Sequence, residues 1–374
     1  MTGAGATAPA VSVVLVHYRT PELLPAALSA VSAQLEELGL EHELLVVDNS
    51  GDAAAAGPLE PPGVRVLHPG ANLGYAGGLV AGVEASRGEA LVLMNPDVLV
   101  GAGCLGALLD PLTRDADVAG PRFYWDEERR LLLPPGEERD LPGELLRALA
   151  TRSPAVADLA RRRWRRHARR HWQASRPIES WTLSGALLAL RRRTWERVGP
   201  FDAGYPLYFE ETDWLIRARR KGVRALHVPA ATAVHHFDQS AQGEPLAQDW
   251  YAESCRRFRR RHYGRLAARV LERMETATGP PPGLAAWPPL EDLRGPLWVE
   301  VSPRACGFPA AAEPSVAEPS AWSLPATIRD RHPKLALHVT LCAGAGREVR
   351  RYTLAGGSAS PVESPSAHSG SRDT

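Results

Sequence analysis

The stretch that decides the fold runs from Ala90 to Asp97 and reads Ala-Leu-Val-Leu-Met-Asn-Pro-Asp. Its apolar run is typical of a strand buried on both faces, and the Asn-Pro-Asp turn ends it. Such strands occur in α/β proteins, where helices cover both faces of a mostly parallel sheet. The stretch therefore predicts an α/β domain that carries the Asp97 carboxylate at the end of one strand.

The neighbouring segments repeat a strand and helix pattern. Upstream, apolar runs predict strands over residues 11–17, 44–48 and 64–68, and helical spacing predicts helices over 21–38 and 75–86. Downstream, the same criteria predict strands over 118–125, 181–190 and 231–234, and helices over 101–112, 194–198 and 210–221. The alternation favours a mostly parallel central sheet.

The length of 374 residues predicts a large domain and a smaller partner. We expect the first domain over 1–278, with a charged helical insertion over about 127–178 and a long arginine-rich helix over about 246–275. The rest is expected to form a proline-rich linker over 279–294, a small β-sandwich-like accessory domain over 295–356 and a disordered tail over 357–374.

Composition excludes several classes of protein. The net charge of +1 argues against a nucleic-acid-binding protein, and no apolar run approaches the roughly 18 residues of a membrane span. The four cysteines lack metal-ligand spacing and fit thiols in a reducing compartment, with a Cys306–Cys342 disulfide left open. The expected location is cytoplasmic, with at most peripheral contact at the inner face of the membrane.

Ligands of parallel sheets bind beyond the carboxyl ends of the strands, so the residues there are the candidates for chemistry. Asp97 fits either a metal site or an ordinary turn. Asp48 fits either a hydrogen-bond acceptor for the N3–H of uracil or thymine, or a turn cap. The glycine-rich residues 72–78 open a helix and could approach a phosphate closely, although their spacing is not a dinucleotide fingerprint.

Later acids and histidines add two further candidates. Glu210, Glu211 and Asp213 begin a helix, where adjacent carboxylates raise one another's pKa and could poise a general base. The alternative is a favourable negative charge at a helix N-terminus. His235 and His236 follow a short strand and could complete a Mg²⁺ or Mn²⁺ shell begun by Asp97 and diphosphate oxygens, although most paired histidines are not ligands.

Taken in order, eight motifs between residues 11 and 264 resemble the family 2 glycosyltransferases, especially bacterial rhamnosyltransferases. They are Val-Asp-Asn (47–49), Asn-Leu-Gly-Tyr-Ala-Gly-Gly (72–78), Asn-Pro-Asp (95–97), Ser-Gly-Ala (184–186), Gly-Pro-Phe-Asp (199–202), Tyr-Phe-Glu-Glu-Thr-Asp-Trp (208–214), Val-His-His (234–236) and Arg-His-Tyr-Gly (261–264). The resemblance implies a GT-A fold, a Rossmann-like domain that binds nucleotide sugars.

The resemblance also implies an inverting, metal-dependent enzyme of cell-surface polysaccharide synthesis. Its donor would be a UDP- or dTDP-sugar, with rhamnose one candidate, and its acceptor a hydroxyl of a glycan or a lipid-linked sugar. The implied metal is Mg²⁺ or Mn²⁺, bound by Asp97 and His235, or alternatively His236. Glu211 would be the catalytic base.

The same resemblance assigns the remaining site residues. The donor-binding set is His17, Tyr18, Arg19, Asp48, Asn49, Asn72, Gly74, Gly77, Gly78 and Asn95, and the acceptor-binding set is Trp181, Ser184 and Gly185. Two departures matter. Asn95 stands where an aspartate is common, and Glu211 stands where an aspartate is usual, which leaves Glu210 and Asp213 as rival bases.

Three alternatives stay open. The arginine-rich helix over about 159–172 could touch anionic lipid or form a solvated, ion-paired face. A nucleotidyltransferase would also use an α/β sheet and a metal, but it would want a basic glycine-rich loop after the first strand. The third is a non-catalytic carbohydrate-binding or scaffold protein. The sequence does not determine the oligomeric state.

Overall fold

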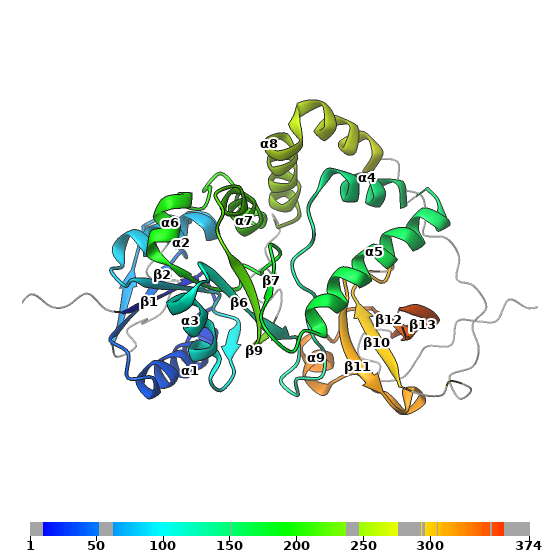
Figure 1. The fold of residues 1–374 in the computed structure, drawn as a ribbon, viewed down its shortest axis with the longest axis horizontal. Coiled ribbons are helices and arrows are strands. Elements are labelled where there is room, and N and C mark those ends of the chain that lie inside the picture. Colours follow the sequence, from blue (N-terminus) through cyan, green and yellow to red (C-terminus); the bar gives the residue numbers. More distant parts are fainter. Residues whose placement is uncertain are drawn as a thin grey trace, which may run out of the picture. The chain divides into compact units, whose positions relative to one another are not determined.

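A computed structural model of the chain describes residues 10–51, 63–150, 152–236, 247–275, 293, 296–304, 306–344 and 346–354 (Figure 1). The chain divides into two compact units. The first comprises Met1–Trp125 and Pro134–Pro280, and the second comprises Asp126–Leu133 and Pro281–Thr374. The expected tail, and all of the expected linker except Leu293, lie outside the described residues.

One half of the sheet in the first unit is parallel. Its strands are β1 (Val11–His17), β2 (His42–Asp48), β3 (Val64–Leu67) and β4 (Ala90–Met94), in the spatial order β3-β2-β1-β4. β1 is buried along its whole length, as its run of β-branched residues predicts. The expected strands of this half are therefore confirmed.

The other half of the sheet mixes directions. It continues from β4 through β8 (Leu187–Arg191), β6 (Val118–Tyr124), β9 (Ala225–His235) and β5 (Val98–Val100), while β7 (Ile178–Glu179) pairs with β9. β8 runs antiparallel to β4 and β6, and β5 and β7 run antiparallel to β9. Most strands still share one direction, which confirms the predicted α/β fold class with a mostly parallel sheet.

Helices connect these strands close to the predicted bounds. They are η1 (Pro21–Leu23), α1 (Leu24–Glu37), α2 (Gly74–Ala85), α3 (Cys104–Arg114), α6 (Arg192–Val198) and α7 (Glu210–Arg220). α2 consists largely of small residues and packs on β1 and β2. A Cβ at Gly82 would lie 2.3 Å from Val14 Cγ1, so the helix approaches the sheet more closely than any larger residue allows.

Three further helices of the first unit are α4 (Leu141–Ala150), α5 (Pro154–Trp172) and α8 (Ala247–Glu275). The buried Glu144 of α4 accepts hydrogen bonds from Arg139 at 2.9 Å, Arg147 at 2.7 Å and Arg259 of α8 at 2.7 Å. Burial opposes ionisation of Glu144, but the three arginines lower its pKa to about 2. α8 is bent, because Gly264 has φ 84° and ψ 163° (Figure 1).

The second unit is a single antiparallel sheet among the residues that can be described. Its strands β10 (Leu297–Ser302), β11 (Ala311–Val316), β12 (Leu337–Ala343) and β13 (Arg347–Leu354) have the order β11-β10-β12-β13. Its short helices are η3 (Pro319–Ala321) and α9 (Ala326–Arg331). The described residues of this unit therefore form one sheet and not the expected sandwich-like arrangement. The sequence could not predict this, because alternating polarity shows which face of a strand is buried but not what covers that face.

Residues Asp126–Leu133 belong to this second unit, whereas the sequence placed them in the helical insertion. Leu132 forms a β-bridge with Ala312, and Arg130 pairs with Glu313 at 2.9 Å. The carboxylate of Asp126 accepts hydrogen bonds from the backbone N–H groups of Arg130 and Leu131. The chain therefore enters the second unit, returns to the first, and enters the second again.

Two further expectations concern membranes and thiols. No helix of the described part of the chain is long and apolar enough to cross a bilayer. The four cysteines, all of which are described, form no disulfide, so the open Cys306–Cys342 pairing is not made.

The close contact between α2 and β1 gives a stability prediction. Gly82→Ala should lower the free energy of unfolding by about 1–3 kcal/mol, because the added methyl group forces Val14 to move. Gly106→Ala in α3 is the matched control, since its Cβ would meet only the end of the exposed Leu38 side chain at 3.3 Å. Urea denaturation compares them, and equal stability of the two variants would contradict the packing argument.

Candidate active site

The strand order places the site between β1 and β4. The chain leaves β1 toward β2 and β3 on one side and returns to β4 on the other, so the order reverses between these two strands. Ligands of open α/β sheets bind at such a reversal, beyond the carboxyl ends of the strands. The residues at the carboxyl ends of β1, β2 and β4, or directly after them, are His17–Arg19, Asp48–Asn49 and Asn95–Asp97, all of which the sequence singled out.

Asp48 is a buried anion. Its Oδ1 accepts a hydrogen bond from the Ser50 backbone N–H at 2.9 Å, and its Oδ2 lies 3.2 Å from His68 Nδ1. Burial raises the pKa of Asp48, but hydrogen bonds from Ser50 and His68 and the electrostatic effect of His17 outweigh burial and lower it. His17 Nδ1 accepts from the Thr20 N–H, so the neutral ring carries its proton on Nε2, 3.9 Å from Asp48.

The glycine-rich loop is tied to the end of β2. Asn49 Nδ2 donates to the Gly74 carbonyl at 2.8 Å, and Asn72 Oδ1 accepts from the Gly74 N–H at 2.9 Å. Gly74 has φ 70°, and a Cβ there would lie 3.1 Å from the Pro206 carbonyl oxygen. Only glycine combines that conformation with that contact, so the loop packs closely against the segment at Pro206.

The other donor-loop residues lie around this loop. Cβ atoms at Gly77 and Gly78 would lie 2.9 Å from Leu73 Cβ and 2.8 Å from Val16 Cγ1, so both glycines permit close packing. Tyr18 is half-buried, and the exposed Arg19 guanidinium lies 5.2 Å from the Tyr18 ring. Arg19 is left-handed with φ 53° and donates from its backbone to Ser50 Oγ.

Asp97 and His235 are brought together by the pairing of β5 with β9. Val98 pairs with His235, so Asp97 lies beside it, and the Asp97 Oδ1 to His235 Nε2 distance is 3.4 Å. His236 is also buried, and its backbone N–H donates to the Asp97 carbonyl at 3.0 Å. Burial opposes ionisation of Asp97, but His235 lowers its pKa, so Asp97 is an anion.

This pair fits a divalent cation that takes its other ligands from a substrate. Counting only partners in the described part of the chain, Asp97 Oδ1 is buried without a conventional hydrogen bond, and the same holds for Asn95 Oδ1 nearby in sequence. Within the described ranges, no three His, Cys, Asp or Glu side chains gather as a complete metal site. Mg²⁺ and Mn²⁺ accept such an arrangement, since one or two protein ligands plus phosphate oxygens and water suffice.

Glu210 and Glu211 differ in their surroundings. Glu210 is 5% exposed, and its Oε2 has no hydrogen-bond partner among the described residues. Burial and the charge of Glu211 raise the pKa of Glu210 well above its usual value, which favours the protonated form of Glu210. Glu211 is half-buried and accepts a hydrogen bond from Thr212 Oγ1 at 3.1 Å, and burial raises its pKa less strongly.

Backbone strain precedes these two acids. Tyr208 and Phe209, which lead into α7, are both left-handed, with φ 65° and φ 71°. Bulky residues rarely adopt this conformation, and each such residue costs about 1–3 kcal/mol. Strain of this kind concentrates at functional sites, where the surrounding structure fixes it.

Tyr75 joins the predicted donor, acceptor and base segments. Its hydroxyl donates to the Gly185 carbonyl at 2.9 Å, and a Cβ at Gly185 would lie 3.1 Å from Glu211 Cβ. Burial and the charges of Glu210, Glu211 and Asp97 raise the pKa of Tyr75 well above its usual value. Since charges act on one phenol only at short range, the structure brings all three acids around it.

The segment predicted to bind the acceptor lies at the end of β4. Asn95 donates from its backbone N–H to the Ala186 carbonyl at 2.9 Å, and Ser184 Oγ accepts from the Ala186 N–H at 3.3 Å. Trp181 is half-buried, packs against the main hydrophobic core and lies 5.9 Å from the Arg219 guanidinium. These contacts fit a core residue as well as they fit an aromatic ring that stacks on an acceptor sugar.

Asp213, named as a rival base, is fully buried in an ion-pair network. Its oxygens lie 2.8 Å from Arg217 Nε, 2.8 Å from His262 Nε2 and 3.0 Å from Arg261 Nε. Burial raises the pKa of Asp213, but these partners outweigh it and lower the pKa. Asp213 therefore holds α7 against α8, and of the three acids only Glu210 and Glu211 act on Tyr75.

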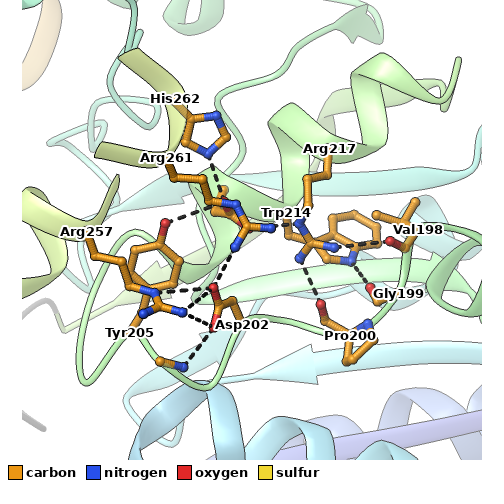
Figure 2. Close-up of polar contacts among 12 residues, drawn as sticks. Val198, Gly199, Pro200, Asp202, Tyr205, Trp214, Arg217, Arg257, Arg261 and His262 are labelled. Atoms are coloured by element: carbon orange, nitrogen blue, oxygen red, sulfur yellow. Dashed lines mark hydrogen bonds and ion pairs between the residues drawn. The ribbon is translucent and has the colours of Figure 1, made fainter. Parts of the chain in front are cut away.

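Figure 2 shows the network around this contact. Asp202 lies between Arg257 and Arg261, at 2.8 Å and 2.6 Å, and Arg217 donates to the carbonyls of Val198 and Pro200. These residues lie in or near the motifs 199–202, 208–214 and 261–264, and the sequence predicted no role for Asp202, Arg217, Arg257 or Arg261. A role for Arg139 was also missed, because no motif marks it. Its guanidinium lies 4.9 Å from the Phe209 ring, and its charge acts on Glu211.

Comparison with known proteins agrees with this geometry. The family model described as glycosyl transferase family 2 matches residues 12–196. Residues 12–196 therefore form a family 2 glycosyltransferase domain. The matched residues of this family 2 domain include the predicted donor loops, the Asn95–Asp97 turn and the Ser184–Ala186 segment.

Two relatives and one solved structure are similar to parts of the chain. An N-acetylglucosaminyl-diphospho-decaprenol L-rhamnosyltransferase of Mycobacterium tuberculosis is 29% identical over 50% of this chain and 63% of its own length. The low-salt glycan biosynthesis hexosyltransferase Agl10 of Haloferax volcanii is 21% identical over 60% of this chain and 66% of its own length. A structure of GalNAc-T7 with UDP, GalNAc and Mn²⁺ has a TM-score of 0.44 at 14% identity, covering 79% of this chain and 61% of that one. The alignment thus spans less than two thirds of the mycobacterial enzyme.

The buried network predicts a large loss of stability on Asp213→Asn. The substitution leaves Arg217, Arg261 and His262 without their anion, which should cost about 3–5 kcal/mol of unfolding free energy. Asp202→Asn is the matched control, because Arg257 and Arg261 are 45% and 42% exposed, and such pairs contribute about 0–1 kcal/mol. Equal effects of the two variants in urea denaturation would show that Asp213 is not the structural anion inferred here.

Proposed function

We propose that this protein is an inverting, metal-dependent glycosyltransferase that moves a sugar from a nucleoside diphosphate donor to an acceptor hydroxyl. The observation that supports it most is the convergence on Tyr75. The predicted donor loop supplies that residue, Gly185 of the predicted acceptor segment accepts its hydrogen bond and packs closely against Glu211, and the Glu211 and Asp97 carboxylates raise its pKa. A transferase needs donor, acceptor and base at one place.

Each acid has a distinct part in the proposed reaction. Asp48 is an anion and can accept the N3–H of a uracil or thymine ring. Glu211 takes the proton of the acceptor hydroxyl as its oxygen attacks the anomeric carbon. The bond from that carbon to the diphosphate breaks, and the electron pair leaves with the nucleoside diphosphate. Glu210 stays protonated, so it adds no second charge beside the base.

Asp97 and His235 would hold the Mg²⁺ or Mn²⁺ ion, with phosphate oxygens of the donor as further ligands. Such a cation neutralises the charge that develops on the leaving diphosphate. Because Asn95 replaces an aspartate, Asp97 provides the carboxylate of this motif alone. Removing it should therefore affect metal use more than removing one of two aspartates would.

The acceptor that we propose is a sugar on a polyprenyl diphosphate, or a glycan derived from one. The relative that acts on N-acetylglucosaminyl-diphospho-decaprenol supports this choice, and it makes L-rhamnose a candidate sugar and dTDP a candidate carrier. Synthesis of cell-surface polysaccharide, at the cytoplasmic face of the membrane, is the corresponding biological setting.

The assignment of the base gives a paired prediction. Glu211→Gln should lower kcat by about 10²–10⁴-fold, since it removes the proton acceptor. Glu210→Gln should retain most activity, because glutamine mimics the protonated form of Glu210. In the wild type, the acid limb of kcat/KM should lie above the usual glutamate pKa, because burial raises the pKa of Glu211.

These effects are measured on UDP- and dTDP-sugar donors with a soluble acceptor analogue. Full activity of Glu211→Gln, or an equal loss in Glu210→Gln, would move the base elsewhere. In a separate assay with a nucleoside triphosphate and a sugar 1-phosphate, formation of a nucleotide sugar with release of inorganic diphosphate would instead favour a nucleotidyltransferase.

The metal assignment is tested by chelation. EDTA should abolish turnover of the wild type, and added Mn²⁺ or Mg²⁺ should restore it. Asp97→Asn should need at least about tenfold more metal for half-maximal activity, because a coordinating carboxylate is lost. Asp202→Asn serves as a control acid outside the site. Unchanged metal dependence in Asp97→Asn would contradict the assignment.

A further inference from the structure

The distal segment of α8, from Arg265 to Glu275, exposes an unusual face. Leu266 is 78% exposed, more than any other large apolar side chain among the described residues, and Val270 is 43% exposed. On the opposite side of the same segment, Ala268 and Leu271 are fully buried. The segment begins after the break at Gly264, so it presents its own face rather than that of the preceding helix (Figure 1).

Helical spacing makes this face continuous. At 100° per residue, Arg265, Leu266, Arg269, Val270 and Arg273 fall within an arc of about 140°. All three arginines are exposed. We call these five residues the α8 strip. The strip contains no acidic residue, and neither Arg265 nor Arg269 makes an ion pair or hydrogen bond with the described part of the chain.

The arginines of α5 behave differently. Arg163 pairs with Asp140 at 2.6 Å, Arg162 pairs with Asp158 at 2.8 Å, and both Arg165 and Arg169 are buried. Most of the arginines in residues 159–172, which the sequence suggested for lipid contact, are therefore paired or buried within the protein. On α8, by contrast, the exposed Arg265 and Arg269 lie beside the exposed apolar side chains of Leu266 and Val270.

The positive charge of the α8 strip indicates what kind of partner can bind it. A second copy of the strip would bring arginines against arginines, whereas an anionic bilayer neutralises the arginines and accepts Leu266 and Val270 among its acyl chains. We propose that the α8 strip docks on the surface of an anionic lipid bilayer. A face with cations beside large apolar side chains has the chemistry of interfacial helices.

The strip is also linked to the candidate base. His262 and Arg261, on the proximal side of Gly264, bind Asp213, which lies two residues after Glu211. Phe209, which precedes these acids, packs against Phe258 of α8 with ring centroids 5.2 Å apart. Docking of the strip would thus hold Glu211 near the bilayer, where a lipid-linked acceptor is presented, and this last step rests on the proposed function.

Vesicle flotation of the full chain tests the proposal. The wild type should float with vesicles of phosphatidylcholine and phosphatidylglycerol, but not with phosphatidylcholine alone, and added salt should weaken binding. Arg265→Glu with Arg269→Glu should weaken binding at least about tenfold, since each arginine contributes separately near an anionic surface. Leu266→Asn with Val270→Asn should weaken it by a similar factor.

The matched control is Arg162→Glu with Arg166→Glu on α5, which should bind like the wild type. Thermal melting should show that all variants fold. The proposal is overturned if the wild type does not bind vesicles, if the α8 variants bind normally, or if the α5 control loses as much binding. A dimer that Leu266→Asn disrupts would identify a second copy as the occupant.

Donor turnover with a soluble acceptor separates this proposal from the proposed function. The α8 variants should keep wild-type turnover in solution. If the wild type binds anionic vesicles but turns over no nucleotide sugar, the docking surface stands and the enzymatic proposal fails. Normal turnover without vesicle binding gives the reverse result.

Discussion

The pairing of β1 with β4 is the constraint on which the site depends. Val11–Leu15 pair in register with Ala90–Met94, while the other edge of β1 pairs with β2. The carboxyl ends of β2, β1 and β4, which are neighbours in the sheet, therefore lie at one edge. Asp48 and Asp97 lie at the same edge. Because β8 runs antiparallel beside β4, the residues that precede β8 reach the same edge. The acceptor segment Ser184–Ala186 is there because of strand direction, not because of its own sequence.

Five buried or half-buried acids in and near the site differ in the partners that surround them. Asp48 has hydrogen bonds and histidines, Asp97 has His235, and Asp213 has two arginines and His262, so each can be an anion although it is buried. Glu210 has no such partner, and its pKa rises. Glu211 is intermediate, with one hydrogen bond from Thr212 and more exposure than Glu210. A carboxylate whose pKa is raised toward neutral pH, and which forms no ion pair with an arginine or histidine, is suited to accept a proton, and among the described residues Glu211 has these properties.

Sequence reasoning found what depends on local pattern and missed what depends on pairing. The apolar runs predicted β1, β2 and β4, and the position of Asp97 after a strand followed from them. β5 has only three residues, too few for a periodic signal, yet its pairing with β9 is what places His235 beside Asp97. The role of Asp213 had a usable signal, since Arg217 follows it by one helical turn. Arg139 had none, because its contact with Phe209 joins residues 70 positions apart.

The arginine-rich composition divides into two functions once contacts are known. Arg139, Arg147 and Arg259 converge on Glu144, and Arg217 and Arg261 converge on Asp213, so two buried acids tie α4, α7 and α8 together. Because α8 is bound to both Glu144 and Asp213, it cannot move independently of the candidate base Glu211, which lies two residues before Asp213. The break at Gly264 then changes the direction of α8 after the last of these contacts, and the arginines beyond it, Arg265 and Arg269, point to solvent. The part of α8 before the bend is thus fixed to the helix that carries Glu211, and the part after the bend is exposed. Both conditions are needed if binding of the exposed part to a bilayer is to position Glu211.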